Sequence, residues 1–118
     1  MASVIVEGGS NPIKVETWQD ALKVELLHKM YRRGCLGSRK DDLFGLGYGR
    51  PIHGQIIFTH DIAEALREMF KDGWIEISST LCECCITQKF DHNNFLKHAT
   101  RLRLTKEGYD RVPEHIFP

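Results

Sequence analysis

The 118-residue sequence lacks any apolar run near the ~20 residues that a membrane-spanning helix needs. It also lacks an excess of charge, because 16 Lys and Arg residues balance 16 Asp and Glu residues. A net charge of zero argues against a strongly basic, nonspecific nucleic-acid coat protein. The N-terminus has no basic segment followed by a long apolar one, so we expect no secretory signal and a cytoplasmic protein.

The chain has 4 cysteines, and three of them lie together at Cys82, Cys84 and Cys85. In a reducing cytosol these side chains are thiols or metal ligands rather than disulfides. With His92 or His98 they offer the donors of a Cys₃His zinc site. On a strand, however, Cys82 and Cys84 share one face while Cys85 points to the other. We therefore expect small buried apolar residues and no cofactor, with zinc binding and thiol sensing as the alternatives.

Catalytic signatures are also missing from the sequence. We find neither a nucleophile elbow nor the two-histidine helix of a metalloprotease. The glycines at 45, 47 and 49 resemble a phosphate loop, but no Walker lysine follows them and no clear strand precedes them. The sequence therefore predicts a protein that is not an enzyme.

The segment 17–33 carries the first helical pattern. Thr17 is a suitable N-cap, and Asp20 stands where the acidic partner of a capping box belongs. Gly34 is a suitable stop. The apolar residues recur at helical spacing and predict a buried stripe, formed by Trp18, Leu22, Leu26, Leu27, Met30 and Tyr31.

The segment 59–73 carries the second helical pattern. Thr59 or Asp61 is expected to cap this helix, with Glu64 closing a capping box on Asp61. Gly73 is expected to end it in the left-handed conformation. The strand 74–78 follows directly. The buried stripe of this helix is predicted to consist of Ile62, Leu66, Met69 and Phe70.

A second alternating strand lies at 100–104, and a short helix at 106–112 follows it. In this strand Leu102 and Leu104 are expected to face the core while Arg101 and Arg103 face water. Thr105 is expected to cap the last helix, and Pro113 to stop it. In the glycine-rich middle segment, Ser38 is expected to cap a short helix that runs through Leu43 or Phe44.

Two motifs in this order resemble parts of a winged helix-turn-helix domain. "DIAEALREMFKDGWIEI" (61–77) is similar to a recognition helix that runs through glycine into the first wing strand. "TRLRLTKEGYDRV" (100–112) is similar to the returning wing strand and its step into a final helix. MarR- and PadR-like transcriptional regulators end their wings in this way. A two-stranded ribbon is marginal alone in water, so the two long helices are expected to cover its apolar face.

The resemblance implies an α+β fold with three or four helices and a small antiparallel β-hairpin wing. We expect an N-terminal arm (1–16), a winged-helix domain (17–112) and a C-terminal tail (113–118). The family's function implies a regulator that binds double-stranded DNA, and paired half-sites favour a homodimer. The arm, with Val4, Ile5 and Val6, or the final helix would supply the dimer contact.

The same resemblance assigns the helix at 59–73 to the major groove and the wing at 79–99 to the DNA backbone or the minor groove. Its implied contact residues are Thr59, His60 and Arg67 for base reading, and Arg39, Lys97, Arg101 and Arg103 for phosphates.

Charge is distributed unevenly around the proposed recognition helix. That helix carries four acidic residues against two basic ones. By contrast, six basic and two acidic residues lie between Lys29 and Arg50, and four basic and no acidic residues lie between Lys97 and Lys106. The basic segments favour DNA binding, although charge runs are often only solvated faces. The acidic helix favours the alternative, a winged-helix module for protein contact without DNA.

Overall fold

The computed structural model describes residues 13–45, 49, 51–80, 90 and 92–112 of the chain. Within these ranges the fold is α+β, with five α-helices, one 3-10 helix and two small antiparallel sheets. None of the described helices has the length and apolar character needed to cross a bilayer. The elements are α1 (Trp18–Arg33), η2 (Gly34–Leu36), β1 (Ser38–Arg39), α2 (Lys40–Gly45), β2 (Pro51–Ile52), β3 (Gln55–Ile56), α3 (Thr59–Lys71), β4 (Ile75–Thr80), α4 (Phe95–His98), β5 (Ala99–Leu104) and α5 (Lys106–Arg111).

The larger sheet has the strand order β1-β5-β4, and both pairings are antiparallel. The expected ribbon is confirmed, because Ile75 pairs with Leu104 and Ile77 pairs with Leu102. Strand β1 was not expected. Ser38 lies in β1, opposite Leu102, so the prediction that Ser38 caps a helix is wrong. The alternation of a strand cannot be recognised in a two-residue segment.

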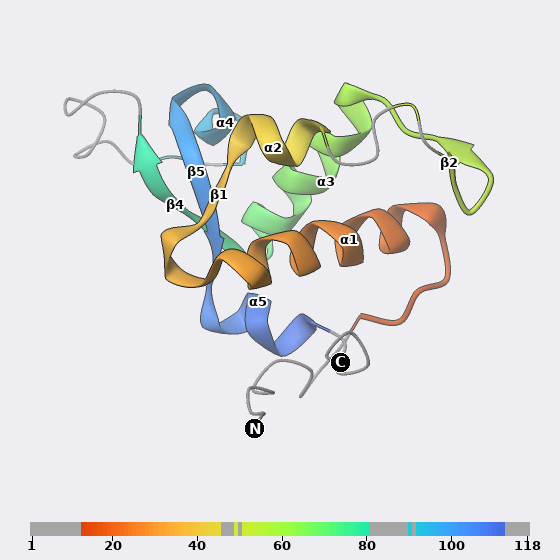
Figure 1. Cartoon of the computed structure of the whole chain (residues 1–118), viewed down its shortest axis with the longest axis horizontal. Helices are drawn as coiled ribbons and strands as arrows, with labels where there is room; N and C mark the ends of the chain where they lie inside the picture. The colour runs from red at the N-terminus through yellow and green to blue at the C-terminus, as the bar shows by residue number, and fades with distance from the viewer. Residues whose placement is uncertain (1–12, 46–48, 50, 81–89, 91, 113–118) are drawn as a thin grey trace.

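Helices cover one face of this sheet and enclose the core (Figure 1). Helices α1 and α2 both contact β5, and α3 contacts α1, α2 and β4. Leu102 and Leu104 are buried as expected, while Ile77 near the end of the ribbon is only half-buried. Both predicted helical stripes enter the core, and their fully enclosed members include Leu26, Leu27, Met30, Ile62, Leu66 and Met69.

The N-terminus of α1 has the capping box that the sequence predicts. The Thr17 hydroxyl accepts a hydrogen bond from the backbone N–H of Asp20 at 3.2 Å. The Asp20 carboxylate accepts one from the backbone N–H of Thr17 at 3.3 Å. Gly34 ends the helix with φ of 59°, a left-handed value that favours glycine.

We predict that Thr17→Ala lowers the free energy of unfolding by about 1 kcal/mol, because the first turn loses its side-chain acceptor. Chemical denaturation of the two proteins measures this difference. Thr17→Ser is the matched control, since its hydroxyl can still accept from Asp20. An equal loss of stability in both variants would show that the methyl group of Thr17 matters and the cap does not.

The cap of α3 differs from the prediction. Phe58 is the N-cap residue, and neither Thr59 nor Asp61 occupies that position. The Asp61 carboxylate instead accepts from the backbone N–H of Phe58 at 2.9 Å, so Asp61 is the acidic partner that Glu64 was expected to be. Phe58 has no side-chain oxygen, so nothing in the sequence marks it as an N-cap residue. The sequence pattern therefore favoured the polar Thr59. Gly73 has φ of 80° beyond the end of α3, as expected.

The middle segment contains a small hairpin that the sequence analysis did not predict. Strands β2 and β3 pair across a two-residue turn. His53 has φ of 49° and Gly54 has φ of 82°, the left-handed pair that two-residue hairpins use. The dipeptide His53-Gly54 between two short apolar segments was the feature of the sequence that could have indicated this turn. The hairpin leads into Phe58 and so places the first turn of α3.

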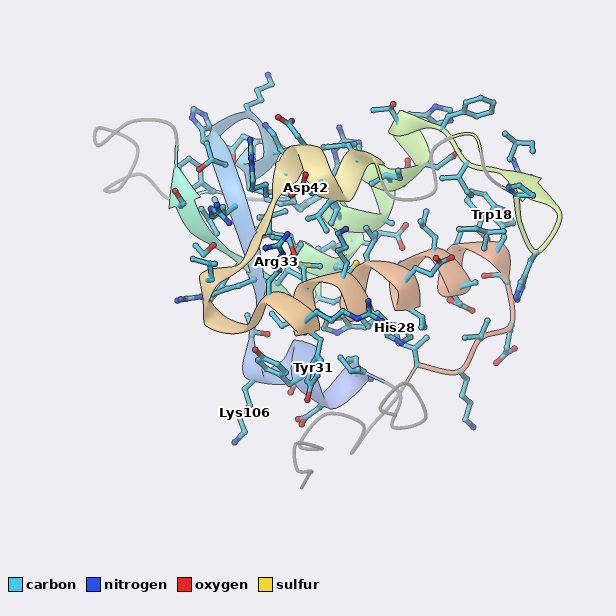
Figure 2. The ribbon with its side chains drawn as sticks, viewed as in Figure 1. Trp18, His28, Tyr31, Arg33, Asp42 and Lys106 are labelled. Carbon is cyan, nitrogen blue, oxygen red and sulfur yellow. The ribbon has the colours of Figure 1, made fainter. Side chains whose placement is uncertain are left out.

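Two short helices at the end of the domain fix the longer elements in place. Helix α4 lies in the segment between β4 and β5, and four residues are too few to show helical periodicity. Its Phe95 is fully buried and stacks on Phe70 of α3, with ring centres 4.1 Å apart. Thr105 is the N-cap of helix α5, and its hydroxyl accepts from the backbone N–H of Gly108 at 3.1 Å, which confirms the predicted cap. Tyr31 points from α1 toward α5 (Figure 2) and packs edge-on against Tyr109.

Candidate nucleic-acid interface

An open groove of about 850 Å³ lies where α2, α3 and α4 meet. We call it the α2–α3–α4 groove. Helix α2 supplies Lys40 and Phe44. Helix α3 and its N-cap residue form the longest wall, and α4 forms the remaining wall. The described residues that line it are Lys40, Phe44, Phe58, Thr59, His60, Ala63, Arg67, Leu96 and Lys97.

The walls of the groove are tied to one another. The Lys40 ammonium group on α2 donates a hydrogen bond to the backbone carbonyl of Leu96 on α4 at 2.6 Å. On the other side of α4, the buried Phe95 ring stacks on Phe70 of α3 with an interplanar angle of 13°. Helix α4 therefore bridges α2 and α3, and Lys97 is carried to the groove by a short helix with a buried anchor.

The groove combines apolar rings with positive charge. Phe58 is 45% exposed, although large apolar side chains are usually covered. The His60 ring stacks on it, with centres 6.2 Å apart and planes at 11°. Arg67 and Lys97 are exposed, while Lys40 is half-buried. Among the described lining residues three are basic (Lys40, Arg67 and Lys97) and none is acidic, although the whole chain is neutral.

Helix α3 separates its charges between two sides. Thr59, His60, Ala63 and Arg67 line the α2–α3–α4 groove, and none of these four carries a negative charge. Three acidic residues of α3 line a smaller cavity of about 230 Å³ beside α1, together with Trp18 and Lys23. The acidic residues of that cavity are Asp61, Glu64 and Glu68. Two of them, Glu64 and Glu68, also border the pocket that Arg67 shares with His92.

The acidic side of α3 is largely engaged in interactions within the fold. The Lys23 ammonium group of α1 forms an ion pair with Glu68 at 2.5 Å. The Asp61 carboxylate accepts from the backbone N–H of Phe58 and also lies 3.2 Å from the His60 ring nitrogen. The excess of acid on this helix therefore does not describe the surface that it presents to the groove.

Three of the predicted phosphate contacts lie on the outer face of the larger sheet. Arg39 of β1 is paired with Arg101 of β5, and Arg103 follows Arg101 on the same face of β5. The Arg103 guanidinium donates to Glu76 at 2.7 Å, and Arg101 donates to the carbonyl of Gly37 at 3.3 Å. Leu102 points inward between them, so these arginines face away from the helices that cover the sheet.

The structure thus brings together four of the seven predicted contact residues. Thr59, His60, Arg67 and Lys97 share the groove, whereas Arg39, Arg101 and Arg103 do not line it. The contacts predicted from the sequence did not include the Phe44 and Phe58 rings or Lys40 of α2. The exposed position of Phe58 follows from the β2–β3 hairpin, and no periodic pattern marks it. The missed lining residues are Lys40, Phe44, Phe58, Ala63 and Leu96.

The cysteine cluster and part of the predicted wing, 81–89 and 91, lie outside the described residues. Cys82, Cys84 and Cys85 belong to the segment 81–89, so the burial, zinc and thiol-sensing interpretations stay predictions. His92 is half-buried beside Arg67 and Lys71 of α3, and His98 lies against Phe90. In the described ranges no cluster of His, Cys, Asp and Glu is arranged to hold a metal ion. The residues of the expected dimer arm, 4–6, also lie outside these ranges.

Comparison with protein-family models, with curated proteins and with solved structures gives no match to this chain.

Proposed function

We propose that the protein is a winged-helix transcriptional regulator, acting in the cytoplasm as a homodimer, that binds DNA through the α2–α3–α4 groove. The arrangement of elements supports this proposal. Helix α3 runs through Gly73 into β4, and β4 pairs with β5 to form the ribbon that a winged domain requires. Helices α1 and α3 pack together over that ribbon (Figure 1).

The observation that carries the proposal is the separation of charge on α3. An anionic duplex approaching the groove side meets Arg67, Lys97 and the exposed His60 ring, with no acidic side chain among the described lining residues. Asp61 and Glu68 line the smaller cavity beside α1 instead. Glu68 pairs with Lys23 of α1, and the Asp61 carboxylate accepts from the backbone N–H of Phe58. Phosphate binding by lysine and arginine releases counterions from DNA, which is the main source of affinity in such complexes.

Each groove residue has a defined role in this proposal. Lys97, on the short α4 helix, contacts a backbone phosphate as a point charge. Arg67, two turns into α3, presents a planar fork that matches either a phosphate or the O6 and N7 edge of guanine. Thr59 and His60 stand exposed in the first turn of α3, where a helix entering a groove makes its base contacts.

The first test replaces Arg67 and Lys97 together by glutamine. If both hold phosphates, the slope of log affinity against log salt becomes shallower by about 1.8, since each contact contributes about 0.9. Fluorescence anisotropy with a mixed-sequence duplex at several salt concentrations measures the slope. Both side chains are exposed, so the fold should tolerate the change.

The matched comparison is Arg101→Gln with Arg103→Gln, which removes the same charge from the outer face of the sheet. Arg103 is already compensated by Glu76, so the slope is expected to stay unchanged. The reverse outcome, a shallower slope in this variant alone, would move the DNA contact from the groove to the outer sheet face. That outcome would agree with the phosphate roles assigned to Arg39, Arg101 and Arg103 from sequence.

A second candidate function is a winged-helix module for protein contact without DNA. The exposed apolar side chains of Ile56 (42%) and Phe58 (45%), close together before α3, favour this alternative. It predicts that the protein shows no salt-dependent affinity for duplex DNA and that substitution of Arg67 and Lys97 changes nothing in the anisotropy measurement.

A further inference from the structure

The α2–α3–α4 groove is lined by three helices, so its lining extends beyond the first turn of α3 that is proposed to enter a DNA groove. Helix α4 bears on the second half of α3, where the buried Phe95 ring stacks on Phe70. The residues before α4 also lie against α3, since His92 and Asn93 share a pocket with Arg67 and Lys71. On its groove side α3 is therefore flanked by α2 and α4, although Arg67, Glu68 and Lys71 in its second half are exposed.

The side chains that line the α2–α3–α4 groove are of the types that bind an unpaired nucleobase. Phe58 presents an exposed ring, and the His60 ring lies nearly parallel to it. Phe44 of α2 and Leu96 of α4 line the same groove. Unstacked bases bind proteins by stacking on aromatic side chains, and each such contact is tolerant of base identity.

Arg67 and Lys97 lie beside the rings, where they can contact the phosphates of a nucleotide whose base has left the stack. Arg67 and Lys97 line the same groove as the rings and are exposed, so their charges can reach phosphates while the base lies among the rings. The volume of about 850 Å³ admits a base with its sugar. Apolar rings flanked by cations, without an acid among the described lining residues, complement a ligand that joins a flat apolar surface to negative charge.

We propose that the groove receives an unpaired base, so that the preferred ligand is duplex DNA containing or adjoining unpaired bases. This inference rests on the proposed DNA-binding function and specifies the form of DNA that the same site takes. Arg67 and Lys97 hold the phosphates on either side of the base, and Phe58 with His60 forms the stacking platform.

The test compares three probes by fluorescence anisotropy with the full chain: an intact duplex, the same duplex with a short internal loop of unpaired thymines, and a single strand of equal length. The looped duplex is expected to bind about tenfold more tightly than the intact one, which is the size of one stacking contact. Phe58→Ala should remove this preference and bring the two affinities together. Phe58→Trp should preserve it, because indole also stacks.

The control variant is Ile56→Ala, which removes an equally exposed apolar side chain that does not line the groove. It should leave the tenfold preference intact, and thermal melts should show that both alanine variants remain folded. Equal affinity of the wild type for the intact and looped duplexes would overturn the inference while leaving DNA binding in place. A uniform loss on all probes in Phe58→Ala would also overturn it.

Two further outcomes distinguish failure of unpaired-base binding from failure of the proposed DNA binding. Failure of all three probes to bind would overturn the proposed function and the inference together. Displacement of bound DNA by an acidic peptide with aromatic side chains, combined with no preference for the looped duplex, would assign the groove to a protein partner and overturn the inference.

Discussion

Replacement of Phe95 by alanine is expected to lower the free energy of unfolding by about 3 to 5 kcal/mol. The Phe95 ring is fully buried and stacks on Phe70 at 4.1 Å, so its removal leaves a cavity and deletes an aromatic pair. The loss would be a large part of the stability of a domain of this size. Denaturant unfolding followed by tryptophan fluorescence measures it, since Trp18 and Trp74 lie in the described fold.

The same substitution should also affect the groove. Phe95 anchors α4, and α4 carries Leu96 and Lys97 into the groove wall. At a temperature where the variant is still folded, its affinity for DNA should fall even though Phe95 itself does not line the groove. Leu96→Ala is the control, because Leu96 is only half-buried and should cost far less stability. A loss under about 1 kcal/mol in Phe95→Ala would contradict the packing of α4 on α3.

The second large effect is expected at Gly108 in α5. A Cβ atom at this position would lie 2.1 Å from the carbonyl oxygen of Trp74 and 3.1 Å from the Leu104 side chain. The Trp74 carbonyl also accepts a hydrogen bond from the backbone N–H of Thr105 at 2.9 Å, so it cannot move freely. Gly108→Ala is therefore expected to cost about 3 kcal/mol of unfolding free energy, through displacement of α5 from β4 and β5.

Thermal unfolding of Gly108→Ala beside Gly45→Ala tests this expectation. Gly45 ends α2, and an added Cβ there meets no atom within 4 Å, so its replacement should change stability by no more than about 0.5 kcal/mol. The ordinary preference of alanine over glycine in helices would predict a gain at both positions. A Gly108→Ala variant of unchanged stability would contradict the close packing of α5 against the Trp74 carbonyl.

Local sequence was sufficient to predict much of the frame of this domain. Long helices reveal themselves by apolar periodicity, which is why the stripes of α1 and α3 were identified, together with the capping box at Thr17. The alternation around Leu102 and Leu104 identified β5, and the glycine at 73 identified the step from α3 into β4. These signals are local, because burial repeats along an element with the period of that element.

Shorter elements carried no such signal. The two residues of β1 and the four of α4 span no full repeat, and their conformation follows from what they pack on. Ser38 therefore became a strand residue opposite Leu102, where local preference indicated a helix cap. Phe58 was not expected at the N-cap of α3, since that position depends on the hairpin before it.

The candidate site is divided in the same way between local sequence and tertiary structure. The sequence by itself determined which residues are charged and that Thr59, His60 and Arg67 lie on one helix. Only the tertiary structure decided how that helix is rotated, with Glu68 toward Lys23 of α1 and Arg67 toward the groove. Only it decided that Lys97 joins the groove while Arg103 lies on the far face of the sheet with Glu76. The physical reason is that a helix or strand sets the spacing of its own side chains, whereas the burial of its apolar face against other elements sets where the remaining faces point.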